Sequence, residues 1–267
     1  MSLLKHPEDR VTVSVAFGLT ALDFALYFLV DNVYLLAGYW LLLLIPKGTL
    51  SAWNHHHQHN FTFRSTALNR LLEFSYGLHT GIVSNCWVLH HVLGHHVHYL
   101  DQSRDESRWQ RKSGRTMGTL EYTLSVALTA YFRAYKVGRN YPERQRVFLG
   151  SALLTSGLVA GLLYHRPLPA LFLFVLPMMC SLLFTAWVTY DHHAGLSTDD
   201  AFQASYNILN RWFNRLTGNL GYHTAHHHSG GLHWSKLPDL HARIADRIPA
   251  HLYRRSTFDV FLPDSPS

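Results

Sequence analysis

The chain has 267 residues, carries a formal net charge of +6 with histidine neutral, and contains 21 histidines. Hydrophobic residues make up 48% and charged residues only 15%, against about 25% charged residues in ordinary soluble domains. The two cysteines, Cys86 and Cys180, exclude a disulfide framework and a zinc ribbon or thiolate iron–sulfur site within one chain. Basic charge combined with apolar segments favours an anionic membrane surface over nucleic acid as the partner.

Two apolar segments near the N-terminus predict a helical hairpin. Residues 11–30 are long enough to cross a hydrocarbon core of about 30 Å. Asp23 interrupts this segment, and we expect it to face protein or water because a carboxylate is costly in lipid. Residues 33–52 form the second segment, which we expect to bend near Pro46 and Gly48.

A second pair of apolar segments predicts another hairpin. The third segment covers residues 147–164 and the fourth covers residues 168–190, with a tight turn at 165–167. Pro177 is expected to kink the fourth segment, since proline removes one helical hydrogen bond.

The polar stretches 54–146 and 191–262 must then lie on one side of the membrane, together with both termini. The first of them is rich in arginine, and the positive-inside rule places that side in the cytoplasm. We therefore predict an all-α integral membrane protein, a single domain over residues 1–267. Four transmembrane helices form two hairpins, and a cytosolic helical cap holds the functional site. The tail after Pro263 is expected to be disordered.

The histidines gather in four clusters beside the ends of the apolar segments, at residues 55–59, 90–98, 192–193 and 223–228. On an α-helix, residues four apart share a face, so His55 and His59 predict one site, as do His91 and His95. By the same spacing His223, His226 and His227 share a face. Adjacent histidines diverge by about 100° and can serve two neighbouring metals. All-imidazole ligation suits iron, zinc or copper.

The remaining histidines leave alternatives open. The sequence does not decide which two of His55–His59 bind metal, nor whether His192 or His193 does. Several others are read as supporting or solvated residues: His56, His57, His90, His98, His192, His228 and His233. His79 and His165 are read as structural, since His165 lies at the opposite end of the spans.

These residues resemble the three histidine boxes of the membrane fatty acid desaturase family. The second box follows Trp87, and the segment HWSKLPDLH after the third box is similar to an ending common in that family. An isolated ligand after the last span is also expected, and His193 fits it. The resemblance implies nine catalytic metal ligands: His55, His59, His91, His95, His96, His193, His223, His226 and His227.

The resemblance implies a membrane non-heme di-iron oxidoreductase that uses two Fe ions and O2 to introduce a double bond into an aliphatic, fatty acyl chain. Electrons would come from a separate donor of ferredoxin, rubredoxin or cytochrome b5 type, because no fused haem motif is present. Thr189 stands where the family often has an asparagine that holds a metal-bound water. Asn219, one turn before His223, is a candidate to hold this water instead. Five acids near the boxes could orient ligating imidazoles: Asp101, Asp105, Glu106, Asp191 and Asp239.

Other functions remain open at this stage. The same boxes could serve a hydroxylase, an alkene-forming decarboxylase or a carotenoid ketolase. A metal transporter would need ionisable residues along the spans, where only Asp23 is evident. A structural membrane protein pinned by zinc is the remaining alternative. The sequence does not give the substrate or its carrier, the position of attack, the electron donor or the oligomeric state.

Overall fold

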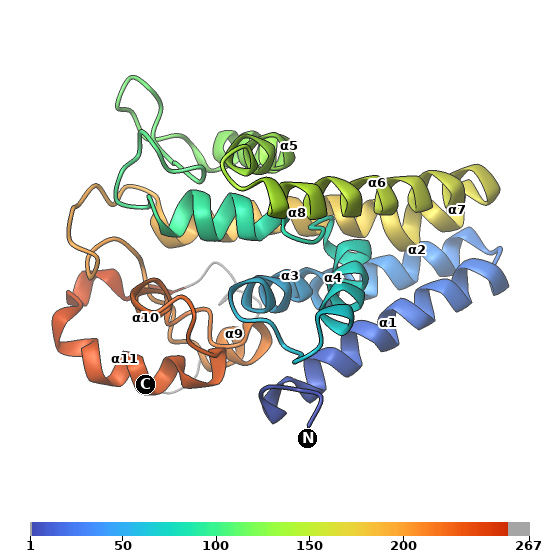
Figure 1. Ribbon diagram of the computed structural model, residues 1–267, viewed down its shortest axis with the longest axis horizontal. Coiled ribbons are helices and arrows are strands. Elements are labelled where there is room, and N and C mark those ends of the chain that lie inside the picture. Colours follow the sequence, from blue (N-terminus) through green and yellow to red (C-terminus); the bar gives the residue numbers. More distant parts are fainter. Residues whose placement is uncertain (1, 256–267) are drawn as a thin grey trace. The chain divides into compact units, whose positions relative to one another are not determined.

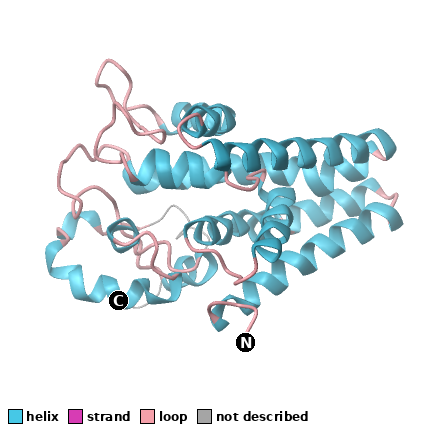
Figure 2. Cartoon of the chain, viewed as in Figure 1, coloured by secondary structure: helices cyan, strands magenta, loops and turns pink. Residues whose placement is uncertain are grey.

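The computed structural model describes residues 2–255, and these residues form helices joined by loops, without a strand (Figure 2). Isolated backbone bridges occur, such as the one between Leu4 and Phe63. The segment after Pro263, expected to be disordered, lies outside the described residues. The chain divides into two compact units, residues 1–89 with 138–185, and residues 90–137 with 186–267.

The first unit contains the long apolar helices (Figure 1). Its elements are η1 (Pro7–Asp9), α1 (Arg10–Leu29), α2 (Val33–Leu42), α3 (Leu44–His59), α4 (Thr66–Thr80), α6 (Pro142–His165), α7 (Pro167–Ala170), the π-helical turn η3 (Leu171–Val175) and most of α8 (Leu176–His193). Tyr27, Leu36, Leu78, Leu162 and Phe174 are central to its buried core, so α1, α2, α4, α6 and η3 pack on one another.

Within residues 2–255, three helices are long and apolar enough to cross a membrane, namely Pro7–Leu29, Pro142–His165 and Pro167–His193. A fourth crossing results if α2 and α3 together form one bent span. The all-helical class and the membrane character predicted from sequence are confirmed at this level. The arrangement of the crossings in a bilayer and the side of the cap stay predictions.

The bend in the second apolar segment lies at Leu43, three residues before the predicted position. The axes of α2 and α3 differ by 51°. Pro46 explains the shift, because it has no N–H to donate to the carbonyl of Leu42, four residues earlier. The helix therefore breaks before the proline, and α3 starts in a new direction that carries the first histidine box.

The two hairpin tips lie at the same end of the first unit. The Arg166 guanidinium, in the tip between α6 and α7, donates to the carbonyls of Tyr27 and Val30 and pairs with Asp31. Val30 and Asp31 belong to the tip between α1 and α2, and Tyr27 lies near the end of α1. His165 bonds to the Tyr27 hydroxyl, 3.1 Å away, which agrees with its expected structural role. These contacts hold the two tips together within this unit.

The second unit contains the amphipathic and short helices. They are most of the π-helix η2 (Val88–His96), then α5 (Thr119–Gly138), the last residues of α8, α9 (Arg211–Thr217), α10 (His223–His228), η4 (Trp234–Lys236), α11 (Leu237–Ile244), η5 (Ala245–Arg247) and η6 (Ala250–Leu252). Its apolar core includes Phe202, Ala225, Leu237, Ile248 and Leu252. Ala225 lies inside the third histidine box, so this core supports the box directly.

Candidate metal centre

The second histidine box lies on a π-helix, η2, rather than an α-helix. Hydrogen bonds in a π-helix join residues five apart, so side chains at that spacing share a face. His91 and His96 accordingly meet, with 3.0 Å between their Nε2 atoms. His91 and His95, which were expected to share one site, fall in two different groups of possible ligands. The predicted divergence of His95 from His96 is confirmed.

Side chains of the first box hold the start of η2. Gln58 Oε1 accepts hydrogen bonds from the backbone N–H groups of Trp87 and Val88, at 3.0 and 3.1 Å. Gln58 is itself held by Asn54, 2.9 Å away. Asn85 has a φ of 58°, a left-handed conformation that asparagine tolerates better than most residues. This turn and this cap direct the chain into the second box.

A similar turn precedes the third box on α10. Asn219 has a φ of 63°, and its side-chain amide donates to the carbonyl of Trp234. A Cβ at Gly221 would lie 2.0 Å from the carbonyl oxygen of Ile208, so only glycine allows this approach. Thr224, inside the box, bonds to the buried amide of Asn207 through both its hydroxyl and its N–H. Asn219 therefore has a structural bond in addition to the role suggested from sequence.

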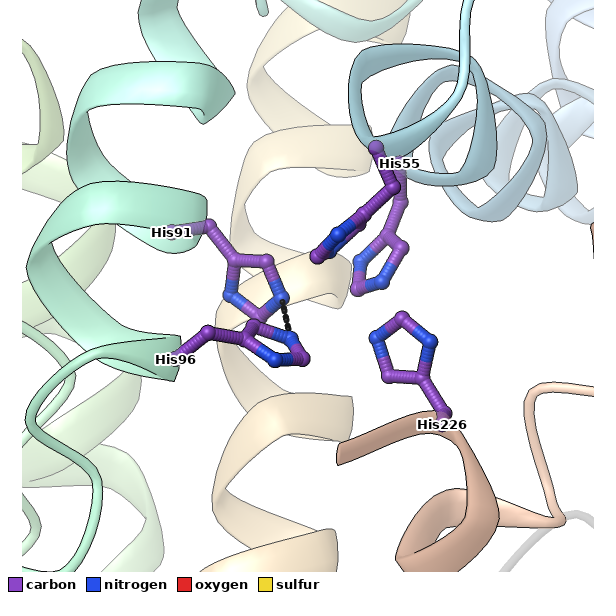
Figure 3. A group of neighbouring side chains, drawn as sticks. His55, His91, His96 and His226 are labelled. Atoms are coloured by element: carbon purple, nitrogen blue, oxygen red, sulfur yellow. Dashed lines mark hydrogen bonds between the residues drawn. The ribbon is translucent and has the colours of Figure 1, made fainter. Parts of the chain in front are cut away.

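A first group of histidines in the second unit consists of His91, His96 and His226. Their ligand nitrogens lie within 4.8 Å of one another. Figure 3 shows these three rings turned towards a common point, with the bond between His91 and His96 drawn as a dashed line. The His96 and His226 ring centroids are 4.7 Å apart and the rings are nearly perpendicular. Helices η2 and α10 thus bring the second and third boxes together.

A second group consists of His95, His193 and His227, whose ligand nitrogens also lie within 4.8 Å of one another. All three side chains are buried. His223 adjoins this group, because its Nε2 lies 2.9 Å from the Nε2 of His193. The adjacent residues His226 and His227 therefore contribute to different groups, as His95 and His96 do.

Hydrogen bonds fix the protonation of three rings in the second group. The Nδ1 atom of His95 lies 2.9 Å from the Asp105 carboxylate, that of His193 lies 2.9 Å from the Ala204 carbonyl, and that of His223 lies 3.3 Å from the Leu220 carbonyl. These oxygens accept, so each Nδ1 carries a proton, and in the neutral ring each Nε2 presents a lone pair.

Nε2 atoms that face one another in this way offer a site for a cation. The Nε2 atom of His193 lies 3.3 Å from that of His95 and 2.9 Å from that of His223, and two neutral acceptors at such distances repel each other. A metal ion bound by the three nitrogens removes this repulsion, and metal-bound histidine commonly donates its other N–H to a carboxylate or carbonyl. The donor set and its tautomers therefore fit a transition-metal ion.

His227 supports the same conclusion. Neither of its ring nitrogens has a hydrogen-bond partner among the described residues. Burial, together with the neighbouring His96, His193, His223 and His95, holds the pKa of His227 well below its usual value. A neutral, buried imidazole without a hydrogen bond is a suitable metal ligand, whereas it is costly as a core residue.

The first box lies in the first unit, at the end of α3. His55 and His59 share one face of this helix, with ring centroids 4.8 Å apart, as their spacing predicts. His57 is buried elsewhere on α3, bonded to Thr62 at 3.0 Å and lying 3.7 Å from the Glu73 carboxylate. This contact agrees with the supporting role considered for His57, and it ties α3 to α4.

The geometry also separates the histidines that sequence left undecided. His193 presents its Nε2 to the second group, whereas the ring of His192 stacks on that of His223 with centroids 4.0 Å apart. Of the five acids considered, Asp105 bonds to a candidate ligand. The other four lie elsewhere: Asp101 bonds to Ser103, Glu106 to Lys136 and Asp191 to Arg254, and Asp239 lies in the first turn of α11.

Two residues near the candidate ligands were not foreseen from the sequence. Gln58 caps η2, although its position inside HHHQH suggested nothing beyond a gap between histidines. Tyr99 packs its ring on His227, with centroids 4.4 Å apart. The spacing of Tyr99, four residues after His95, was the available signal that it shares the face of a candidate ligand.

The comparison with protein families decides the wider relationship. A sequence model described as fatty acid desaturase matches residues 32–258, which include most of each unit and every candidate ligand. The chain belongs to the fatty acid desaturase family. No curated protein and no solved structure matches the chain.

Membership of the desaturase family makes this chain an oxidoreductase of desaturase type, in a family known for its use of iron. The apolar helices agree with a membrane protein that acts on lipid. The two groups of histidines in the second unit could each hold a metal ion, as expected for such a desaturase.

Proposed function

We propose that this chain is an O2-dependent di-iron desaturase that introduces a double bond into a fatty acyl chain. The observation that carries the proposal is the division of the adjacent pairs His95–His96 and His226–His227 between two groups of ligand nitrogens. One metal ion would need only one such group. Two neighbouring groups that share both boxes favour a two-metal centre.

The proposed ligands follow from these groups and from the histidine boxes. For one iron the second unit supplies His91, His96 and His226, and the first box, His55 and His59, supplies two more. For the other iron the ligands are His95, His193, His223 and His227. This set comprises the nine residues selected from the sequence.

Bound iron would supply the chemistry of O2 reduction: two hydrogens leave adjacent carbons of the substrate, two electrons and two protons enter from outside, and two waters form. The chain's own residues prepare the site. Asp105 and the carbonyls of Ala204 and Leu220 keep protons on the Nδ1 atoms of three ligands, so that the Nε2 lone pairs point inward. Burial of His95, His193 and His227 keeps bulk water away from the oxidising centre.

The same proposal includes the membrane topology. The apolar helices would make four crossings in two hairpins within one domain, with termini and histidine boxes in the cytoplasm. Support comes from the shared end of the two hairpin tips and from the arginines of the polar stretch. A separate redox protein would deliver the electrons.

The mass of the product tests the reaction. Purified protein in lipid, given a reductant system and a set of acyl substrates, should yield products that have lost two hydrogens. A His226→Ala/His227→Ala variant should yield none. A gain of one oxygen would instead identify a hydroxylase built on the same ligands.

A further inference from the structure

Helix α5 (Thr119–Gly138) has an exposed apolar stripe along its whole length. Large hydrophobic side chains recur at spacings of three or four, with exposures of 71% at Leu120, 41% at Leu124, 79% at Leu128, 69% at Phe132 and 45% at Tyr135. At 100° per residue these five positions fall within about 120° of the helix surface. Scattered exposed leucines are ordinary, but a continuous stripe marks a docking surface.

The other side of α5 packs against the rest of the protein. Val126, Ala127, Ala130 and Ala134 are buried. Polar side chains on this side hold the loop after the second histidine box: the Tyr122 hydroxyl donates to the Ser107 carbonyl at 3.0 Å, and Arg133 donates to the Glu106 carbonyl. The stripe is therefore the outer side of a fixed helix.

Three features of the chain favour lipid as the occupant. First, only residues 139–141 separate α5 from α6, which is one of the helices able to cross a membrane. The C-terminal end of α5 is thus covalently held at a membrane surface. The stripe runs parallel to the helix axis. All of it can therefore contact the bilayer only if α5 lies along the membrane surface.

Second, exposed cations precede and follow α5 in the sequence, as expected for a helix whose ends meet the phosphates of a bilayer. They are Arg111, Lys112 and Arg115 before the helix, and Arg139, Arg144 and Arg146 after it. Glu121 is the one acid in the sequence of α5, and its charge is balanced by Arg111 at 2.7 Å. Apolar stripes bordered by basic residues are typical of helices that lie in the membrane interface.

Third, aromatic residues lie at the end of α5 that adjoins the crossing. Tyr135 and Tyr141 are 45% and 41% exposed. Tyrosine is enriched at the level of lipid headgroups, because its ring is apolar and its hydroxyl is polar.

We propose that α5 is an interfacial helix, with Leu120, Leu124, Leu128, Phe132 and Tyr135 inserted into the leaflet in which α6 begins. The helix connects that leaflet to the candidate metal centre. Its inner side holds Glu106 and Ser107, and the adjacent Asp105 orients His95. Lipid contact would set the height of the second histidine box relative to the bilayer, and hence which part of a membrane-embedded acyl chain reaches it. This last consequence rests on the proposed function, whereas the lipid contact does not.

Spin-label accessibility in the full chain tests the lipid contact. A nitroxide is attached at Leu128→Cys in a Cys180→Ala background, since Cys86 is fully buried. The protein is placed in phosphatidylcholine nanodiscs, and relaxation by O2, which concentrates in lipid, is compared with relaxation by a water-soluble nickel chelate. Leu153→Cys, on an exposed position of α6, gives the lipid reference, and Arg243→Cys, on an exposed position of α11, gives the water reference.

The label at Leu128 is expected to behave like the one at Leu153, with O2 access well above nickel access. Leu124→Cys, one turn away, should behave likewise and replaces Leu128→Cys if that variant does not fold. A label that matches the one at Arg243 would overturn the proposal, because the stripe would then face water. Low access to both reagents would also overturn it, since a second copy or another protein would cover the stripe. Neither result depends on catalytic activity, so failure here is distinct from failure of the desaturase proposal.

Discussion

Lys47 Nζ lies 2.6 Å from Asp23 Oδ2, and neither side chain is more than 2% exposed. The Lys47 ammonium also donates to the Leu173 carbonyl at 3.2 Å. That carbonyl is free for it, because Pro177, four residues later, has no N–H to donate. Tyr39 donates to the other carboxylate oxygen at 2.7 Å. This confirms the expectation that Asp23 faces protein or water, and it joins α1, α2, α3 and η3 around one carboxylate.

Removal of one member of this ion pair should destabilise the protein more than removal of both. Asp23→Leu leaves a buried ammonium without its counter-charge, and Lys47→Met leaves a buried carboxylate, at a cost of about 3–5 kcal/mol each. The double variant should lose less stability than either single variant, because no uncompensated charge stays buried. Unfolding of detergent-solubilised protein measures the three values. Additive losses would show that the two charges do not stabilise each other.

Asp105 should control metal retention through His95. Asp105→Asn removes the negative charge beside the Nδ1 of His95, and loss of such an orienting group typically lowers metal affinity about 10–100-fold. Iron retained after dialysis against graded chelator concentrations measures the effect. Asp101→Asn is the matched control, because Asp101 lies on the same loop but bonds to Ser103. Equal iron loss in both variants would contradict the assigned role.

Gln58 should stabilise the start of η2 by its carbonyl oxygen. Gln58→Leu leaves the N–H groups of Trp87 and Val88 without an acceptor and should lower the free energy of unfolding by about 1–3 kcal/mol. Gln58→Glu keeps an acceptor oxygen and should retain much more of the stability. Thermal unfolding of the two variants compares them. If the glutamate variant were as unstable as the leucine variant, acceptance by the side-chain oxygen would not be the cause.

Gly221 should not tolerate a methyl group. The Cβ of Gly221→Ala would overlap the Ile208 carbonyl, and relief of such overpacking costs about 1–3 kcal/mol. Because the third box begins two residues later, bound metal should fall as well. At Gly231 nothing lies within 4 Å of an added Cβ, so Gly231→Ala should be almost neutral. Unfolding and metal content of the two variants are the measurements, and a stable, metal-replete Gly221→Ala would refute the packing argument.

The sequence predicted the helical class, the apolar segments and the sharing of one face by His55 and His59, because these depend on local composition and on the α-helical period. It did not predict that His91 meets His96. That pairing depends on a π-helix, and the cap that Gln58 provides on η2 comes from a residue about thirty positions earlier, a contact that spacing does not encode. Likewise, the choice of His193 over His192 depends on which ring turns its Nε2 towards His95 and His223, and sequence spacing does not encode that contact. The bend lies at Leu43 rather than at the predicted Pro46, because a proline disrupts the helical turn that precedes it.

The central claim is a two-iron centre divided between two groups of histidines, and metal analysis of purified protein from iron-replete cells tests it most directly. We expect about two iron ions per chain. His91→Ala/His226→Ala and His95→Ala/His227→Ala, which disrupt one group each, should each retain about one. Stoichiometric zinc that persists after iron-replete growth, or protein without bound metal, would contradict the account and favour a structural role for the histidines.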